Sequence, residues 1–148
     1  MQLTPYTLHH ADGSLRKQGQ HLDGEKHGEW RTWHPTGQLA SISHFSLGLA
    51  TGEWRSYYPD GQLKAIRSFE NGKEHGRREV HYRKRYWIED FKHGVKHGLW
   101  QEWEGEHLRK QGEYRDGLEE GEWSEFGDAG EVLSLKVFEQ GKLIKRIV

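Results

Sequence analysis

A glycine pattern that recurs about every 23 residues constrains this chain more than any other feature of its sequence. Each copy begins with an aromatic residue or histidine. A glycine follows three positions later and a second glycine four positions after the first. In four of the five copies a tryptophan stands two positions after the second glycine. The second glycines are spaced 24, 24, 22 and 23 residues apart: Gly28, Gly52, Gly76, Gly98 and Gly121. Five copies in one register, and a half copy from Phe138, predict a repeat architecture.

A second turn lies halfway through each copy. It carries Gly13, Gly37, Gly61, Gly105 or Gly130. Glycines, which readily adopt positive φ, therefore lie at both ends of each short segment. The third copy lacks this glycine and runs through as "HYRKRYW". A two-residue turn there requires a residue other than glycine at positive φ, or a different type of turn.

The segments between turns are six to eight residues long, which suits strands and is too short for helices. We therefore expect an all-β fold, an elongated, twisted antiparallel meander of about six β-hairpin repeats. One domain is expected to cover residues 1–148. Its repeats are placed at about 7–26, 27–49, 50–73, 74–95, 96–119 and 120–143, with an end strand at 143–148.

Alternation along each predicted strand divides the apolar residues between two faces. One face collects the tryptophans after the second glycines and the aromatic residues that open each copy, so we expect it to be the core. Leucine or valine six residues earlier has an even offset and is expected on the same face. This set is Trp30, Trp54, Trp100, Trp123, Phe45, Phe69, Phe91, Tyr114, Phe138, Leu39, Leu63, Leu108 and Val132.

The opposite face is predicted to carry a second row of rings, three positions after the first aromatic residue. The row consists of Trp33, Tyr57, His81, Trp103 and Phe126. Rings among charged residues are typical of an exposed protein interface. Curling of the sheet would instead bury the row, and the sequence leaves both alternatives open.

The composition is polar, with 32% hydrophobic and 30% charged residues and a mean hydropathy of −1.04. Seven Trp, six Tyr and five Phe nevertheless argue against disorder and indicate a thin core built from rings. There is no cysteine, no signal-like N-terminal stretch and no apolar run long enough to cross a bilayer. We expect a cytoplasmic protein.

Charge is unevenly distributed, although the formal net charge is only −1. Residues 102–131 contain eleven acidic and three basic residues, a net charge of −8. A basic segment precedes them, with Arg77, Arg78, Arg83, Lys84 and Arg85. These runs are either solvated strand faces that balance one another or a polarised surface that steers a charged partner.

No catalytic, metal-binding or cofactor-binding motif is present, so we expect no enzyme activity, metal or cofactor. His27, His75 and His97 each precede a second glycine, which favours a role in the turn. The basic segment interleaves rings with arginine, as in proteins that bind single-stranded nucleic acid, but a pI near 6.8 argues against that function.

The units "GEWRTWHPTGQL" and "GEWRSYYPDGQL" resemble the MORN-repeat variant of bacterial proteins, which includes YwqK-type antitoxins. The resemblance extends from about Thr7 to Leu143, and the third copy departs from it. It implies an antiparallel array of hairpins and, for the bacterial variant, an antitoxin or immunity protein that acts on a cognate toxin.

The expected mechanism is occlusion of a basic toxin cleft by acidic residues, with rings as anchors. The candidate partner-binding residues are Trp33, Tyr57, Glu102, Trp103, Glu104, Glu119, Glu122, Glu125 and Phe126. The alternative is a scaffold or adaptor that binds anionic lipid or another protein through Arg77, Arg78, Arg83, Lys84 and Arg85. Strand addition at an unpaired edge, or dimerisation, is a third possible contact.

Overall fold

The computed structural model describes residues 2–148 and confirms the all-β class. The chain divides into two compact units, the first ending at Lys73 and the second beginning at Glu74. The first unit contains β1 (Leu3–His9), β2 (Leu15–Leu22), β3 (Glu25–Lys26), β4 (Gly28–Trp33), β5 (Leu39–Ser46), β6 (Leu49–Ala50), β7 (Gly52–Tyr57) and β8 (Leu63–Glu70), and β9 (Lys73–Glu74) lies at the boundary.

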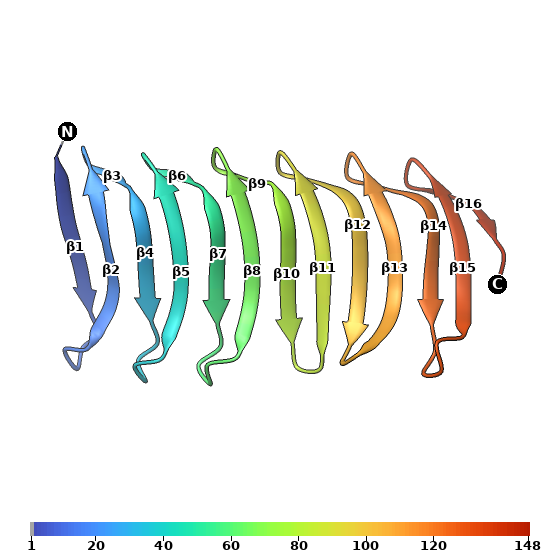
Figure 1. Ribbon diagram of the computed structural model, residues 1–148, viewed down its shortest axis with the longest axis horizontal. Helices are drawn as coiled ribbons and strands as arrows, with labels where there is room; N and C mark the ends of the chain where they lie inside the picture. The colour runs from blue at the N-terminus through green and yellow to red at the C-terminus, as the bar shows by residue number, and fades with distance from the viewer. Residues whose placement is uncertain (1) are drawn as a thin grey trace. The chain divides into compact units, whose positions relative to one another are not determined.

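The second unit is an antiparallel meander in which each strand pairs with the next one along the chain (Figure 1). Its strands are β10 (Gly76–Tyr82), β11 (Arg85–Lys92), β12 (Val95–Glu104), β13 (His107–Arg115), β14 (Leu118–Phe126), β15 (Val132–Glu139) and β16 (Lys142–Arg146). The first unit follows the same rule through β1, β2, β4, β5, β7 and β8. No helix among residues 2–148 is long and apolar enough to cross a membrane.

The turn glycines adopt the conformations that the repeat predicts. Gly24 and Gly72 have φ of 83° and 82°, and the residues before them, Asp23 and Asn71, both have φ of 50°. Two successive positive φ angles match the right-handed twist of the flanking strands in a tight hairpin. In the third copy Arg83 has φ of 58°, which confirms that the missing glycine leaves another residue in the left-handed region.

The core is thin and consists of rings, as expected. Trp30 and Trp123 are the buried hydrophobic residues of the described chain, at 3% and 7% exposure. Each packs against rings from neighbouring strands, for example Tyr114 at 5.1 Å and Phe138 at 6.3 Å from Trp123. We call the face of each unit that carries these tryptophans the core face, and the other its second face.

The expectation that leucine shares the core face was wrong. Leu39 pairs with Trp33 and Leu108 with Trp103, and a register shift precedes both pairs. One extra residue in the returning strand forms a β-bulge and reverses the alternation beyond it. Leu39, Leu63, Leu108 and Val132 therefore lie beside the second row of rings, opposite Trp33, Tyr57, Trp103 and Phe126.

Histidines before the second glycine bond neighbouring repeats together, which confirms their predicted role in the turn. The Nδ1 atom of His27 accepts a hydrogen bond from the Leu47 amide at 3.2 Å, and His97 accepts one from Asp116 at 3.4 Å. His75 does the same for the amide of His93, at 3.2 Å. Each bond satisfies a backbone donor in the turn of the next repeat.

Candidate protein-binding face

Three stacked rings cross the second face of the second unit. His81 lies 5.1 Å from Tyr86 with an interplanar angle of 17°, and Tyr86 lies 6.1 Å from Trp103 at 3°. They come from β10, β11 and β12, whose strand spacing sets the separation of the rings. All three rings are half-buried, so the row is neither a closed core nor a freely exposed strip.

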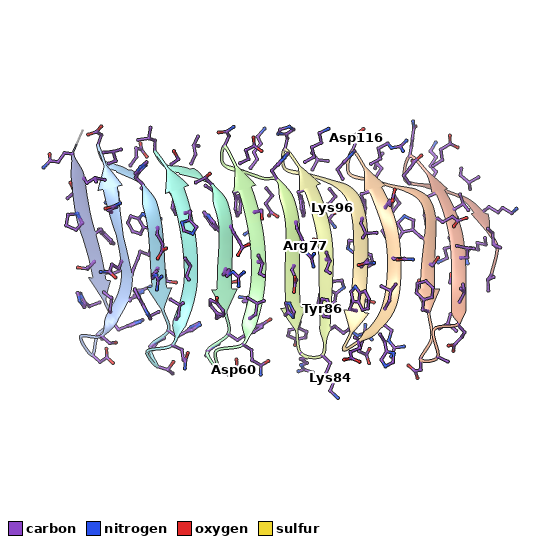
Figure 2. All side chains as sticks on the ribbon, viewed as in Figure 1. Asp60, Arg77, Lys84, Tyr86, Lys96 and Asp116 are labelled. Atoms are coloured by element: carbon purple, nitrogen blue, oxygen red, sulfur yellow. The ribbon has the colours of Figure 1, made fainter. Side chains whose placement is uncertain are left out.

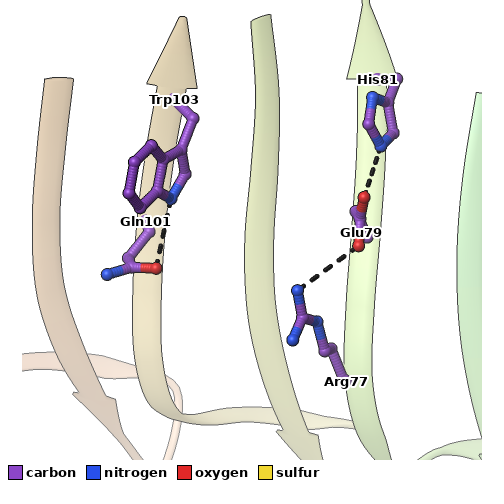
Figure 3. Close-up of polar contacts among 5 residues, drawn as sticks. All are labelled: Arg77, Glu79, His81, Gln101 and Trp103. Atoms are coloured by element: carbon purple, nitrogen blue, oxygen red, sulfur yellow. Dashed lines mark hydrogen bonds and ion pairs between the residues drawn. The ribbon is translucent and has the colours of Figure 1, made fainter. Parts of the chain in front are cut away.

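Polar side chains hold both ends of this stack (Figure 3). Glu79 accepts a hydrogen bond from the His81 Nε2 atom at 2.5 Å and pairs with Arg77 at 3.5 Å. The Trp103 indole donates to Gln101 at 3.2 Å, in an interaction between two residues of β12. Because these contacts are made along single strands, the rings are oriented before any partner arrives.

An apolar hollow of about 330 Å³ lies beyond Trp103, where β12, β13 and β14 end. Its lining includes the side chains of Trp103, Leu108 and Phe126, together with Glu106, His107 and two glycines of the neighbouring turns. The bulge that displaces Leu108 is what brings this leucine between the two rings. The hollow offers a mainly apolar surface at one edge of the second face, with Glu106 as its acidic lining residue.

An acidic hollow of about 410 Å³ lies further along β13 and β14 on the same face. Its lining includes Glu113, Glu120 and Glu122, and the backbone of Gly112 and Gly121. Glu120 pairs with Arg115 at 3.8 Å and accepts a hydrogen bond from the Gln140 amide. Within residues 2–148, no ion pair is made to Glu113 or Glu122.

Comparison of equivalent strand positions shows why Glu122 lacks a cation. On the second face of the first unit, Glu29 pairs with Arg31 and Glu53 pairs with Arg55, two residues further along the strand. In β14 the residue two positions after Glu122 is Ser124. The repeat therefore keeps the carboxylate and loses its guanidinium partner here.

Three of the predicted acidic residues lie on the core face instead, so they do not join Glu122. Glu102 accepts a hydrogen bond from the Trp87 indole at 2.9 Å and pairs with Arg85 at 3.7 Å. Glu125 pairs with Lys110 at 3.6 Å, and Glu119 lines the same small hollow of about 140 Å³. Core rings such as Trp100 and Trp123 and the Lys110–Glu125 ion pair line this hollow.

The remaining predicted residues are also accounted for. Glu104 is shared between Arg85 at 3.3 Å and Arg109 at 3.6 Å, which compensates its charge. Arg109 in turn binds Asp128, and this hydrogen bond raises the pKa of Arg109. Trp33 and Tyr57 lie in the first unit, where their carbonyl groups accept hydrogen bonds from His10 and His34. Trp103, Glu122 and Phe126 are the predicted residues that share the second face of the second unit.

The predicted basic patch is not one surface. Arg78 lies on the core face, with its guanidinium 5.6 Å from the Phe91 ring and ion pairs to Glu74 and Glu89. Arg77 and Arg85 have acidic partners of their own. The remaining cations, Arg83 and Lys84, lie at the tip of the β10–β11 hairpin, and Figure 2 shows Lys84 directed away from the strands.

Sequence reasoning missed Leu99, Gln101, Leu108 and Glu113 as members of this face. Leu99 is 40% exposed and lines the acidic hollow. The available signal was the change of residue type at fixed repeat positions, with Arg31 and Arg55 replaced by Gln101 and Ser124. Together the side chains form a face with a mainly apolar hollow, a ring stack, and carboxylates to which no ion pair is made within residues 2–148.

Two segments of the chain match a known protein family. Residues 26–46 and 50–71 match the family described as MORN repeat variant, and both segments lie in the first unit. The chain therefore carries MORN repeat variants there, and the two matched segments contain β4 and β7 with their Glu–Arg pairs. No curated protein matches the chain significantly.

Proposed function

We propose that this chain is a binding protein of the antitoxin or immunity type, which blocks a basic toxin by covering its active site. The observation that carries the proposal is the second face of the second unit, where Glu113 and Glu122 lie on the same face as the rings of Trp103 and Phe126 and have no cationic partner among residues 2–148. Toxins that act on nucleic acids or phospholipids carry basic clefts. Unpaired carboxylates attract such a cleft, and rings supply most of the affinity once contact is made.

The net charge of −8 between residues 102 and 131 supports the same proposal. A surface of one sign raises the association rate with a partner of opposite sign, and salt screens this effect. We expect the association rate to fall steeply between low and physiological ionic strength.

The scaffold alternative, binding to anionic lipid, receives less support. Ion pairs to Glu79, Glu89, Glu102 and Glu104 engage most of the basic residues on which it depends. Two cations at the β10–β11 tip contribute only about 1 kcal/mol each at a charged membrane surface. Stable anchoring needs more than this.

The test begins with the chain as bait in an extract of its native cells. A basic nuclease, deaminase or hydrolase retained in equal amount is purified and assayed with increasing amounts of the chain. We expect its activity to fall to zero near one equivalent. Retention without inhibition at excess would remove the antitoxin proposal. Retention on anionic vesicles, abolished by Arg83→Glu with Lys84→Glu, would support the scaffold instead.

A further inference from the structure

The second face of the second unit has a direction, because its two hollows follow one another along β14. Glu122 and Ser124 line the acidic hollow, and Phe126 lines the apolar hollow. These residues alternate with Trp123 and Glu125 of the core face, so they project from one side of the strand. Four residues of extended chain span about 13 Å, which sets the separation of the acidic point from the apolar one.

We propose that this groove binds a single extended segment of the partner, with a lysine or arginine at Glu113 and Glu122 and an apolar side chain at Trp103, Leu108 and Phe126. The inference rests on the proposed function only for the identity of the protein that supplies the segment. The groove itself selects the segment by charge and by spacing.

Charge complementarity identifies the occupant. Arg31 and Arg55 neutralise Glu29 and Glu53 from within the same strands, whereas no ion pair is made to Glu122 within residues 2–148, and Glu113 of β13 lines the same hollow. A cationic side chain from outside replaces the missing arginine. It also restores the local charge balance without moving any strand.

The spacing of the segment follows from strand alternation. In an extended chain, residues four apart lie on the same side and about 13 Å from each other, which matches the two hollows. Residues three apart lie on opposite sides, so only one of their side chains can enter the groove. The groove thus prefers a cation and an apolar residue separated by three intervening residues.

The hollow at Trp103 is already formed before the apolar side chain of the segment enters it. Gln101 accepts from the Trp103 indole and donates to Gln111 at 3.4 Å, so the ring is held by a neutral polar pair. Leu108 and Phe126 supply its other apolar walls, and Glu106 and His107 lie in the same lining. A preformed pocket lowers the entropic cost of ordering side chains on binding.

The experiment uses the full chain, labelled with ¹⁵N, and short capped peptides made of serine, threonine and glycine with one arginine and one phenylalanine. One peptide places phenylalanine four residues after arginine, and the other places it three residues after. We expect the first to shift the Trp103 indole and Ser124 amide signals and to bind about fivefold more tightly than the second. Equal affinity of the two peptides would overturn the proposal.

A matched pair of variants tests the charge. Glu113→Gln with Glu122→Gln removes the unpaired carboxylates, and Glu29→Gln with Glu53→Gln removes the same number of charges where arginines already compensate them. We expect the first pair of substitutions to lower the affinity for the four-spaced peptide about fivefold, and the second pair to leave this affinity unchanged. Equal loss in both variants would overturn the inference, because only the overall charge would then matter.

Failure of this inference is distinguishable from failure of the proposed function. If the variant with Glu113→Gln and Glu122→Gln inhibits a captured toxin as strongly as the wild type does, the groove proposal is overturned and the antitoxin proposal stands. Selective binding of the four-spaced peptide, with no toxin inhibited, would support the groove and remove the antitoxin proposal.

Discussion

Gly19 and Gly112 lie beneath the two buried tryptophans of this protein. A Cβ atom on Gly19 would come within 2.2 Å of the Trp30 indole, and one on Gly112 within 2.1 Å of the Trp123 indole. Both glycines have ordinary backbone angles, unlike the turn glycines. They are required for the close approach of a ring rather than for a turn, and each admits one indole flat against its strand.

Replacement of Gly112 by alanine tests this contact. We expect Gly112→Ala to destabilise the chain by about 1–3 kcal/mol, because the methyl group displaces Trp123. Ser43 faces Trp54 at the equivalent position, so Ser43→Ala is the control and is expected to change stability by less than about 0.5 kcal/mol. Chemical denaturation measures both, and wild-type stability of Gly112→Ala would contradict the packing described.

The turn histidines give a second prediction at this scale. His97→Ala removes the acceptor for the Asp116 amide, which then exchanges with solvent about two- to tenfold faster. Hydrogen exchange followed by NMR measures this rate. The Leu47 amide, bound by His27 in the first unit, serves as an internal control. Unchanged exchange at Asp116 would show that His97 does not protect it.

At the scale of elements, the β10–β11 hairpin is the irregular one. Arg83 occupies the left-handed region at φ 58°, where residues other than glycine are strained. Arg78 replaces the usual tryptophan and continues the ring ladder through its contact with Phe91. The hairpin therefore keeps its register without the turn glycine and without the tryptophan.

Glycine at this turn is expected to relieve the strain. Arg83→Gly should raise the free energy of unfolding by about 0.5 kcal/mol, since the relief exceeds the entropy that glycine adds to the unfolded chain. Lys84, whose φ is not positive, provides the control. Lys84→Gly should destabilise by about 0.5–1 kcal/mol. Thermal melts compare the stabilities of the two variants. Destabilisation by Arg83→Gly would show that Arg83 is not strained in this turn.

At the scale of the whole molecule, the packing contacts described are short-range in sequence. Each strand pairs with its neighbours along the chain, and each buried tryptophan packs within its own unit. Repeat proteins of this kind gain stability as a sum of repeat and nearest-neighbour contributions. No single central core has to form before the rest.

Additivity follows from this organisation. The stability losses of Gly19→Ala and Gly112→Ala, measured singly and together by chemical denaturation, should add to within about 0.5 kcal/mol. The two substitutions lie in different units, and each contacts one tryptophan. A double variant that loses much more than the sum would indicate cooperative unfolding through contacts beyond these.

The acidic residues between 102 and 131 divide at the same scale into those with ion pairs and those without, within the described chain. Glu102 and Glu125 have ion pairs on the core face, whereas Glu113 and Glu122 have none in the described chain. The charge count of residues 102–131 predicted an acidic region, but not this division. Ion pairing depends on which strands lie side by side. The charge count cannot show this, because it treats every carboxylate alike.

The sequence by itself determined the repeat, the turns and the ring core, because glycine spacing and alternation act over a few residues. Only the tertiary structure decided which side Leu39 and Leu108 occupy, since a bulge of one residue reverses alternation and leaves no fixed motif. It also decided that Arg78 belongs to the core face, and that Glu122 and Phe126 line two hollows on one face of β14. Such neighbours are set by pairing across strands, which composition and periodicity do not record.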